Sequence, residues 1–209
     1  MTAPLYILEG AWDTPLEASQ ILPYFLAYEG SHKEVKVYHR TIRSAADIAY
    51  YVSKIPMKSR SFVYFACHGE PGFLDPSDGR SKISYESVLE SLGMARKDSI
   101  SFLHFGSCEF LQTENRKQYL SRLANAAGSM WTSGYAKDVD WLASTLLDLA
   151  LVSEVYVPWH EAPNRKARAE KAALDFHSAY SQLSRSLGFS ALSSLRGAST
   201  LFPPRVRGA

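Results

Sequence analysis

The sequence lacks most of the features that mark secreted or membrane-bound proteins. Its 209 residues include two cysteines, Cys67 and Cys108, which are too few for a disulfide framework and favour a reducing, cytoplasmic setting. The first residues lack the basic and apolar stretches of a secretion signal. Since no apolar run reaches the roughly 18 residues that a membrane-spanning helix needs, we expect no membrane contact.

Neither sign of charge dominates the sequence. With 23 basic and 21 acidic residues the formal net charge is +2, which gives no electrostatic reason to expect nucleic-acid binding. Cysteine and histidine residues are not clustered at the spacings of metal ligands, so we expect no metal site. The length and the 46% apolar content are instead typical of one globular domain with a sizeable core.

Segments typical of strands and of helices alternate along the chain. The expected strands are 5–9, 34–40, 61–68, 100–108 and 129–135, and the expected helices are 16–28, 44–55, 84–92, 119–127, 139–152 and 164–187. Pro23 either kinks the first helix or marks a late start. Residues 70–82 are rich in Gly, Pro and Asp and predict a loop or hairpin.

This alternation predicts an α/β fold of three layers, with a mainly parallel sheet of about six strands flanked by helices. No segment has the composition of a linker between domains. We therefore expect a single domain over residues 1–196, followed by a flexible C-terminal tail over residues 197–209.

Two of the expected strands end in residues that can do chemistry. Residues 61–69 (SFVYFACHG) finish on His68 and Gly69, and residues 100–108 (ISFLHFGSC) finish on Cys108. The separation of 40 positions from His68 to Cys108 suits one crossover between adjacent parallel strands. Both residues would then lie at the carboxyl edge of the sheet, where open α/β sheets place their ligands. A thiol beside an imidazole is the minimal apparatus for covalent acyl transfer.

Each of these residues also has a structural interpretation. A cysteine after an apolar strand is often an inert core residue, whereas the change of polarity at Glu109 favours a position of Cys108 at the strand mouth, and both interpretations stay open. Gly69 leaves its amide unobstructed, so the amides of Gly69 and Cys108 could hold an oxyanion. Cys67 precedes the histidine and is expected to face the opposite side of the sheet as a structural residue.

The two strand endings resemble those of the caspase-like cysteine peptidases, a group that includes metacaspases, gingipains, separases and CHAT domains. Residues 133–141 (SGYAKDVDW) are also similar to the strand-to-helix junction that lines the specificity pocket in that group. The resemblance covers residues 5–152 and is greatest to small, single-domain bacterial members. The sequence departs from the group at Gly106-Ser107, where metacaspases have Asp-Ser and caspases have Gln-Ala.

The resemblance implies a caspase-like fold and a cysteine endopeptidase with a His68–Cys108 dyad. It implies that Cys108 attacks the peptide carbonyl, that His68 protonates the leaving amine, and that no cofactor is required. The partners implied are a protein or peptide substrate and an activating protease or partner protein. The resemblance also suggests a role in bacterial antiviral defence or stress response.

Asp138 and Asp140 have two interpretations. Either aspartate could cap the helix expected from residue 139, or could form the floor of a pocket for an arginine or lysine side chain, with Trp141 as an apolar wall. One aspartate could serve each purpose. In the second case the enzyme would cleave after a basic residue.

Two other functions remain open. The chain could be a catalytically silent, caspase-like interaction module. It could also be another cysteine acyltransferase or hydrolase built on a similar sheet.

Overall fold

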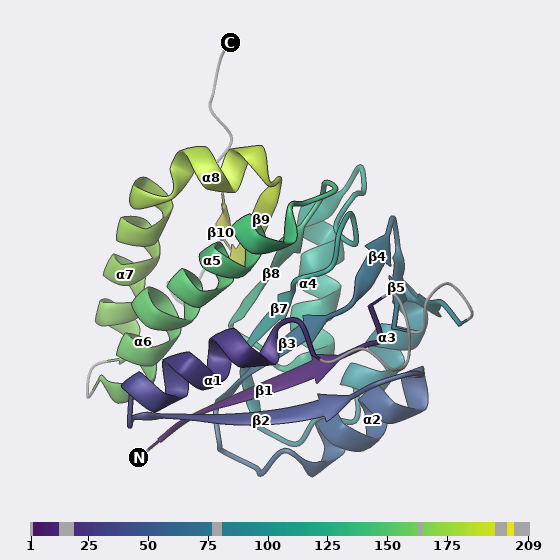
Figure 1. Cartoon of the computed structure of the whole chain (residues 1–209), viewed down its shortest axis with the longest axis horizontal. Coiled ribbons are helices and arrows are strands. Elements are labelled where there is room, and N and C mark those ends of the chain that lie inside the picture. Colours follow the sequence, from purple (N-terminus) through teal and green to yellow (C-terminus); the bar gives the residue numbers. More distant parts are fainter. Residues whose placement is uncertain (1, 13–18, 77–80, 163–164, 195–199, 203–209) are drawn as a thin grey trace.

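The structure is a computed structural model, and it describes residues 2–12, 19–76, 81–162, 165–194 and 200–202 (Figure 1). Its strands are β1 (Ala3–Glu9), β2 (Val35–Thr41), β3 (Ser61–Ala66), β4 (His68–Glu70), β5 (Phe73–Asp75), β6 (Ile83–Ser84), β7 (Ile100–Phe105), β8 (Trp131–Tyr135), β9 (Phe189–Ser193) and β10 (Thr200–Phe202). Its helices are α1 (Leu22–Ser31), α2 (Ala45–Lys54), α3 (Tyr85–Leu92), α4 (Arg116–Ala127), α5 (Trp141–Leu151), the π-helical turn η1 (Val152–Tyr156), α6 (Val157–Glu161), α7 (Arg165–Ala179) and α8 (Ser181–Ser186).

The main sheet has the strand order β10-β9-β8-β7-β3-β1-β2. The five strands from β8 to β2 are parallel to their neighbours, and β9 and β10 continue the sheet with antiparallel pairing. Strands β4, β5 and β6 form a second, small antiparallel sheet in the segment expected to be a loop or hairpin. The expected α/β fold with a mainly parallel sheet is confirmed.

Helices cover both faces of the main sheet and create two hydrophobic cores. One core joins α1, α5, η1, α6 and α7 to one face of the sheet, through side chains such as Phe25, Phe62 and Leu151. The other joins α2, α3 and α4 to the opposite face, through side chains such as Val63, Phe105 and Leu123. Figure 1 shows α1, α5 and α6 in front of the strands and α2, α3 and α4 behind them. The result is the expected three-layer arrangement.

Local signals in the sequence fix where several helices begin and end. Ser44 and Ser84 cap α2 and α3, because each hydroxyl accepts a hydrogen bond from the backbone N–H three residues later. Gly128 ends α4 in the left-handed conformation, with φ of 65°. Pro23 lies in the first turn of α1, so it marks the late start that was one of its two interpretations.

Helices α5, η1 and α6 run on from one another over Trp141–Glu161. This rod of 21 residues is long and apolar enough to cross a membrane by length and composition, although we expected no such segment. Half of its most apolar stretch is buried inside the molecule, as in the core helix of a globular domain.

A buried carboxylate ties this rod to three strands. Asp148 of α5 accepts hydrogen bonds from the hydroxyl groups of Tyr64 in β3 and Tyr135 in β8, at 2.8 and 2.5 Å. His104 of β7 places its Nε2 atom 2.7 Å from the same carboxylate, and its Nδ1 atom lies 2.8 Å from Ser133 Oγ. Because a buried charge is stable only when it is paired, this cluster fixes the position of α5 on the sheet.

The C-terminal third of the chain differs most from the expectation. The single helix expected over residues 164–187 is two helices, because the backbone leaves the helical conformation at Tyr180, where α7 gives way to α8. The strand β9 was not expected at all. The tail expected from residue 197 is wrong for residues 200–202, because they pair with β9 as β10. Residues 197–199 and 203–209 of that tail lie outside the described residues.

Candidate functional site

The two strands that end in His68 and Cys108 are neighbours. Strands β3 and β7 are parallel and pair from Phe62 with Phe102 to Phe65 with Phe105. Beyond the last pair, the Gly106 N–H donates a hydrogen bond of 2.9 Å to the carbonyl oxygen of Phe65. Both chains therefore leave the sheet side by side at its carboxyl edge, as the spacing predicted.

The backbones of Gly69 and Cys108 are in direct contact there. A Cβ atom on Gly69 would lie 2.4 Å from the carbonyl oxygen of Cys108 and 3.3 Å from its nitrogen. It would also lie 2.8 Å from the Cβ atom of Ser107. Only glycine fits this approach, which brings the segment carrying His68 against the turn carrying Cys108.

The turn after Cys108 is strained and anchored. Glu109 adopts a φ of 52°, which is uncommon for a residue with a side chain and recurs at functional sites. Its N–H donates to the carbonyl oxygen of Lys137 at 3.0 Å, and the Cys108 Sγ atom lies 4.0 Å from the carbonyl oxygen of Val139. The connection between β8 and α5 thus packs against the turn that carries Cys108.

Cys108 is partly exposed, and its thiol stays protonated at neutral pH. Burial raises the pKa of the Cys108 thiol, and the neighbouring carboxylate of Asp138 raises this pKa further by hydrogen bonding and by charge repulsion. The side chain of Asp138 therefore lies close to Cys108. This carboxylate opposes formation of the thiolate unless something neutralises it.

Cys67 differs sharply from Cys108. It is 1% exposed, its Sγ atom lies 3.5 Å from Ser107 Oγ, and burial raises the pKa of its thiol to about 12. Such a thiol forms almost no thiolate at neutral pH. Cys67 is thus a core residue, as expected.

His68 is exposed and lies in the first position of β4. The register of the small sheet places it opposite Asp75 of β5, which is 8% exposed. Side chains at directly opposite positions of an antiparallel pair lie on the same face, with Cβ atoms about 4.5–5.5 Å apart. The indole ring of Trp12 also packs edge-on against the imidazole ring, with 5.3 Å between ring centroids. Trp12 therefore contacts the imidazole ring, and Asp75 lies beside His68 on the same face of the small sheet.

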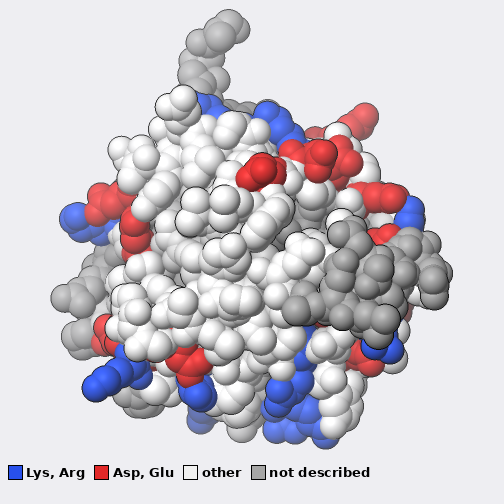
Figure 2. All heavy atoms as spheres, in the orientation of Figure 1, with Lys and Arg blue, Asp and Glu red and all other residues white. Residues whose placement is uncertain are grey.

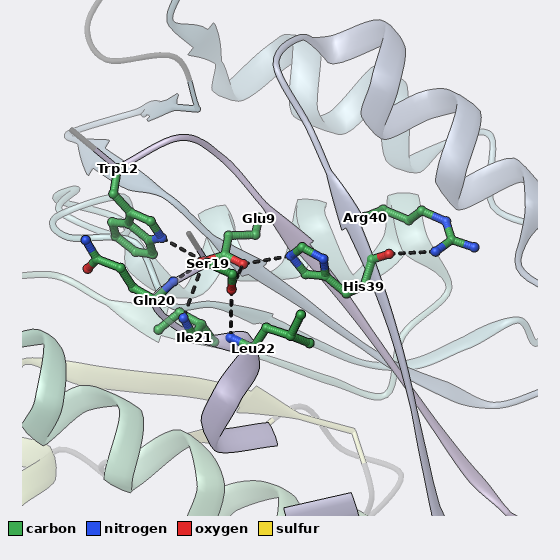
Figure 3. A network of polar contacts seen from close by, with 8 residues as sticks. All are labelled: Glu9, Trp12, Ser19, Gln20, Ile21, Leu22, His39 and Arg40. Carbon is green, nitrogen blue, oxygen red and sulfur yellow. Dashed lines mark hydrogen bonds and ion pairs between the residues drawn. The ribbon is translucent and has the colours of Figure 1, made fainter. Parts of the chain in front are cut away.

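Trp12 is itself held by a buried carboxylate (Figure 3). Glu9, the last residue of β1, is 3% exposed, and its Oε1 atom accepts a hydrogen bond of 2.7 Å from Trp12 Nε1. Burial alone would raise the pKa of Glu9, but the hydrogen bonds from its neighbours outweigh it and lower this pKa. The remaining partners of this carboxylate are His39 Nε2 at 2.7 Å, Ser19 Oγ, and the backbone N–H groups of Gln20 and Ile21.

The structure separates the roles of Asp138 and Asp140. Asp140 is the N-cap of α5, and its Oδ1 atom accepts a hydrogen bond of 2.8 Å from the Ala143 N–H. Asp138 is not the N-cap of α5, and its carboxylate is close enough to the Cys108 thiol to raise the pKa of that thiol. Trp141 is the first residue of α5, is 44% exposed, and packs edge-on against Tyr24 of α1. Of these three candidates, Asp138 is the one whose carboxylate raises the pKa of the Cys108 thiol.

Sequence reasoning missed Glu9, Trp12 and Asp75. Glu9 had one available signal, because an acidic residue at the end of an apolar strand is expected to be buried only if it is paired. Trp12 and Asp75 gave no such signal, since their positions depend on loops and on a strand pairing that the sequence does not reveal.

No protein-family model matches the sequence, and no curated protein matches it either. Among residues 2–12, 19–76, 81–162, 165–194 and 200–202, no three His, Cys, Asp or Glu side chains are grouped to hold a metal ion. The candidate site is therefore defined by its own geometry at the carboxyl edge of the sheet.

Proposed function

We propose that this protein is a caspase-like cysteine endopeptidase in which Cys108 is the nucleophile and His68 is the general acid and base. The observation that carries the proposal is the contact between Gly69 and Cys108, which brings the ends of β3 and β7 together and leaves no room for any side chain at residue 69. The strained turn at Glu109 and the partial exposure of Cys108 support it.

The reaction follows from these positions. His68 takes the proton of the Cys108 thiol, and the sulfur forms a bond to the peptide carbonyl carbon while the amides of Gly69 and Cys108 bind the oxyanion. His68 then gives the proton to the leaving nitrogen as the C–N bond breaks. Water, deprotonated by His68, attacks the thioester, and the sulfur leaves as a thiol on receiving that proton.

We assign the specificity pocket to Asp138 and expect cleavage after arginine or lysine. A basic side chain bound at Asp138 forms a charge-assisted pair. The same pair neutralises the carboxylate that raises the pKa of the Cys108 thiol. Binding of a basic substrate would therefore favour the thiolate, so that specificity and activation depend on one residue.

A catalytically silent interaction module is the second candidate function. The raised pKa of the Cys108 thiol favours it, and so does a broad face without charged side chains over α1 and α5 (Figure 2). The exposed apolar residues on these helices are Leu26, Trp141, Leu142 and Leu146.

An activating protease, which the resemblance implies, would meet a basic residue after Cys108 at Arg116. This residue begins α4, and its guanidinium donates hydrogen bonds to the Leu111 carbonyl oxygen and to Ser190 Oγ. A protease would have to open these contacts before cutting.

The proposed role in bacterial defence or stress response rests on the resemblance of the strand endings.

The proposal is tested with a library of fluorogenic peptides. Each peptide is assayed with the wild type and with the variants Cys108→Ala, His68→Ala and Cys67→Ala. We expect cleavage after arginine or lysine by the wild type and by Cys67→Ala, and none by the other two variants. An arginine chloromethylketone should alkylate Cys108 in the wild type, as read by peptide mass spectrometry. A folded wild type that neither cleaves the library nor reacts with this probe would identify the chain as a silent module.

A further inference from the structure

A hollow lies at the opposite end of the strands from Cys108. This cavity of about 450 Å³ opens beside the amino ends of β1 and β3, where α6 also ends. Its size is within the range of pockets that hold small organic ligands. Its lining residues are Thr2, Pro4, Tyr6, Tyr38, Pro56, Lys58, Ser59, Arg60 and His160.

The charge of this lining has one sign. It contains Lys58, Arg60 and His160, and it contains no Asp or Glu among the residues that the structure describes. Burial lowers the pKa of His160, so at neutral pH the positive charge comes from Lys58 and Arg60. A pocket with two cations and no carboxylate attracts an anion.

One wall of the pocket is aromatic. Tyr6 of β1 and Tyr38 of β2 are paired in the sheet, and their rings stack with 4.7 Å between centroids and 14° between planes. Tyr38 remains 37% exposed. Paired rings at a pocket wall provide a flat apolar surface for a planar group.

The cationic loop is held in a conformation that residues with side chains rarely adopt. Lys58 and Arg60 have φ angles of 63° and 56°. Their N–H groups donate to the carbonyl oxygens of Lys97 and Asp98, at 3.2 and 3.1 Å, which fixes the loop against the segment before β7. Backbone strain that persists because neighbours hold it recurs at ligand clamps.

From these four observations we infer that this pocket binds an anionic ligand with a planar ring, of the nucleotide class. Lys58 and Arg60 bind its phosphate groups, and the Tyr6–Tyr38 pair packs against its ring. The pocket is separate from the carboxyl edge of the sheet, and the inference does not depend on the proposed peptidase activity.

The inference is tested by isothermal titration calorimetry. The ligands are ADP, adenosine and inorganic diphosphate, each titrated at the same ionic strength. We expect ADP to bind more tightly than either fragment, because each fragment makes one half of the contacts. Arg60→Gln and Lys58→Gln should each weaken ADP binding by about tenfold or more, since each removes a charge-assisted contact. The substitutions keep a side chain of similar length, and circular dichroism checks that the variants are folded.

Two pairs of controls make the test specific. Arg43→Gln and Lys117→Gln change the net charge equally at exposed positions outside the pocket, and they should leave the affinity for ADP unchanged. Tyr38→Leu should weaken ADP binding without affecting diphosphate, whereas Tyr38→Phe should preserve both. The inference is overturned if ADP does not bind, if adenosine binds as tightly as ADP, or if the control variants lose as much affinity as the pocket variants.

Discussion

A Cβ atom on Gly69 would lie 2.4 Å from the carbonyl oxygen of Cys108, so these two residues can approach only because one of them is glycine. Gly69→Ala must therefore push the two strand endings apart. We expect kcat/KM for peptide substrates to fall by at least about 100-fold, because small displacements of reacting groups have effects of that size.

Gly30→Ala is the matched control for this substitution. A Cβ atom on Gly30 would meet nothing within 4 Å, and alanine should stabilise its helix. Steady-state kinetics and urea unfolding of both variants separate a local displacement from a loss of fold. Full activity of Gly69→Ala would contradict the close approach.

Asp138→Asn should change reactivity and activity in opposite directions. Since the carboxylate raises the pKa of the Cys108 thiol, its removal lowers this pKa and increases the thiolate fraction at any pH below it. Alkylation by iodoacetamide should shift to lower pH, with about tenfold faster reaction for each unit by which the pKa falls. Cleavage after arginine should nevertheless fall about 100-fold, because a charge-assisted hydrogen bond contributes about 1.5–3 kcal/mol.

Asp140→Asn provides the control here, because asparagine caps helices as well as aspartate does. It should leave both the alkylation profile and the cleavage rate near those of the wild type. If the alkylation profile shifts for Asp140→Asn and not for Asp138→Asn, the roles assigned to these two residues are the wrong way round.

Glu9→Gln should destabilise the fold in a pH-dependent way. The amide places an N–H₂ group among donors that now bind a carboxylate, and we expect a loss of about 1.5–3 kcal/mol in the free energy of unfolding at pH 7. Because the folded-state pKa of Glu9 is lowered, its contribution is present above the ordinary value of 4.5 and is lost as the pH falls through the folded-state value.

Urea unfolding of the wild type and of Glu9→Gln from pH 7 to acid conditions measures this effect. The difference in stability between them should shrink as the pH falls below 4.5. Glu70→Gln, at an exposed residue paired with Lys82, should cost at most about 1 kcal/mol. A difference between wild type and Glu9→Gln that grows on acidification would show that the carboxylate is not stabilised in the folded state.

Asp148→Ala should be among the most destabilising single changes in the chain. It leaves the hydroxyl groups of Tyr64 and Tyr135 without their shared acceptor and removes the carboxylate that lies 2.7 Å from His104 Nε2, and loss of one partner from a buried pair costs about 3–5 kcal/mol. Asp175→Ala, which breaks a surface pair with Lys171, should change stability by about 1 kcal/mol or less. Similar unfolding midpoints for the two variants would disprove the structural role of the cluster.

The sequence predicted the parts of the fold that local patterns determine. The strand endings at His68 and Cys108 were predicted as neighbours because apolar runs, small residues and a single crossover length all indicated the same arrangement. The strand β9 was missed because it is only five residues long and follows closely on the helix expected over residues 164–187. The left-handed Gly188, with φ of 65°, is what separates them.

For the candidate site, the sequence predicted the positions of residues along the chain but not the contacts between their side chains. The roles of Asp138 and Asp140 could not be separated from sequence, because residues two positions apart can each precede the same helix. The contact between Trp12 and His68 joins segments more than fifty residues apart, and it depends on the buried carboxylate of Glu9. Such contacts are a property of the packed molecule, and no local pattern encodes them.

The position of Asp148 in the chain also has a consequence for folding during synthesis. Tyr64, His104 and Tyr135 leave the ribosome before Asp148, and their polar groups meet at a carboxylate that does not yet exist. Closing the strands around them earlier would bury these groups without a partner, which is unfavourable. The nascent sheet should therefore stay hydrated on this face until α5 has emerged, which makes the last step of assembly non-local and slow.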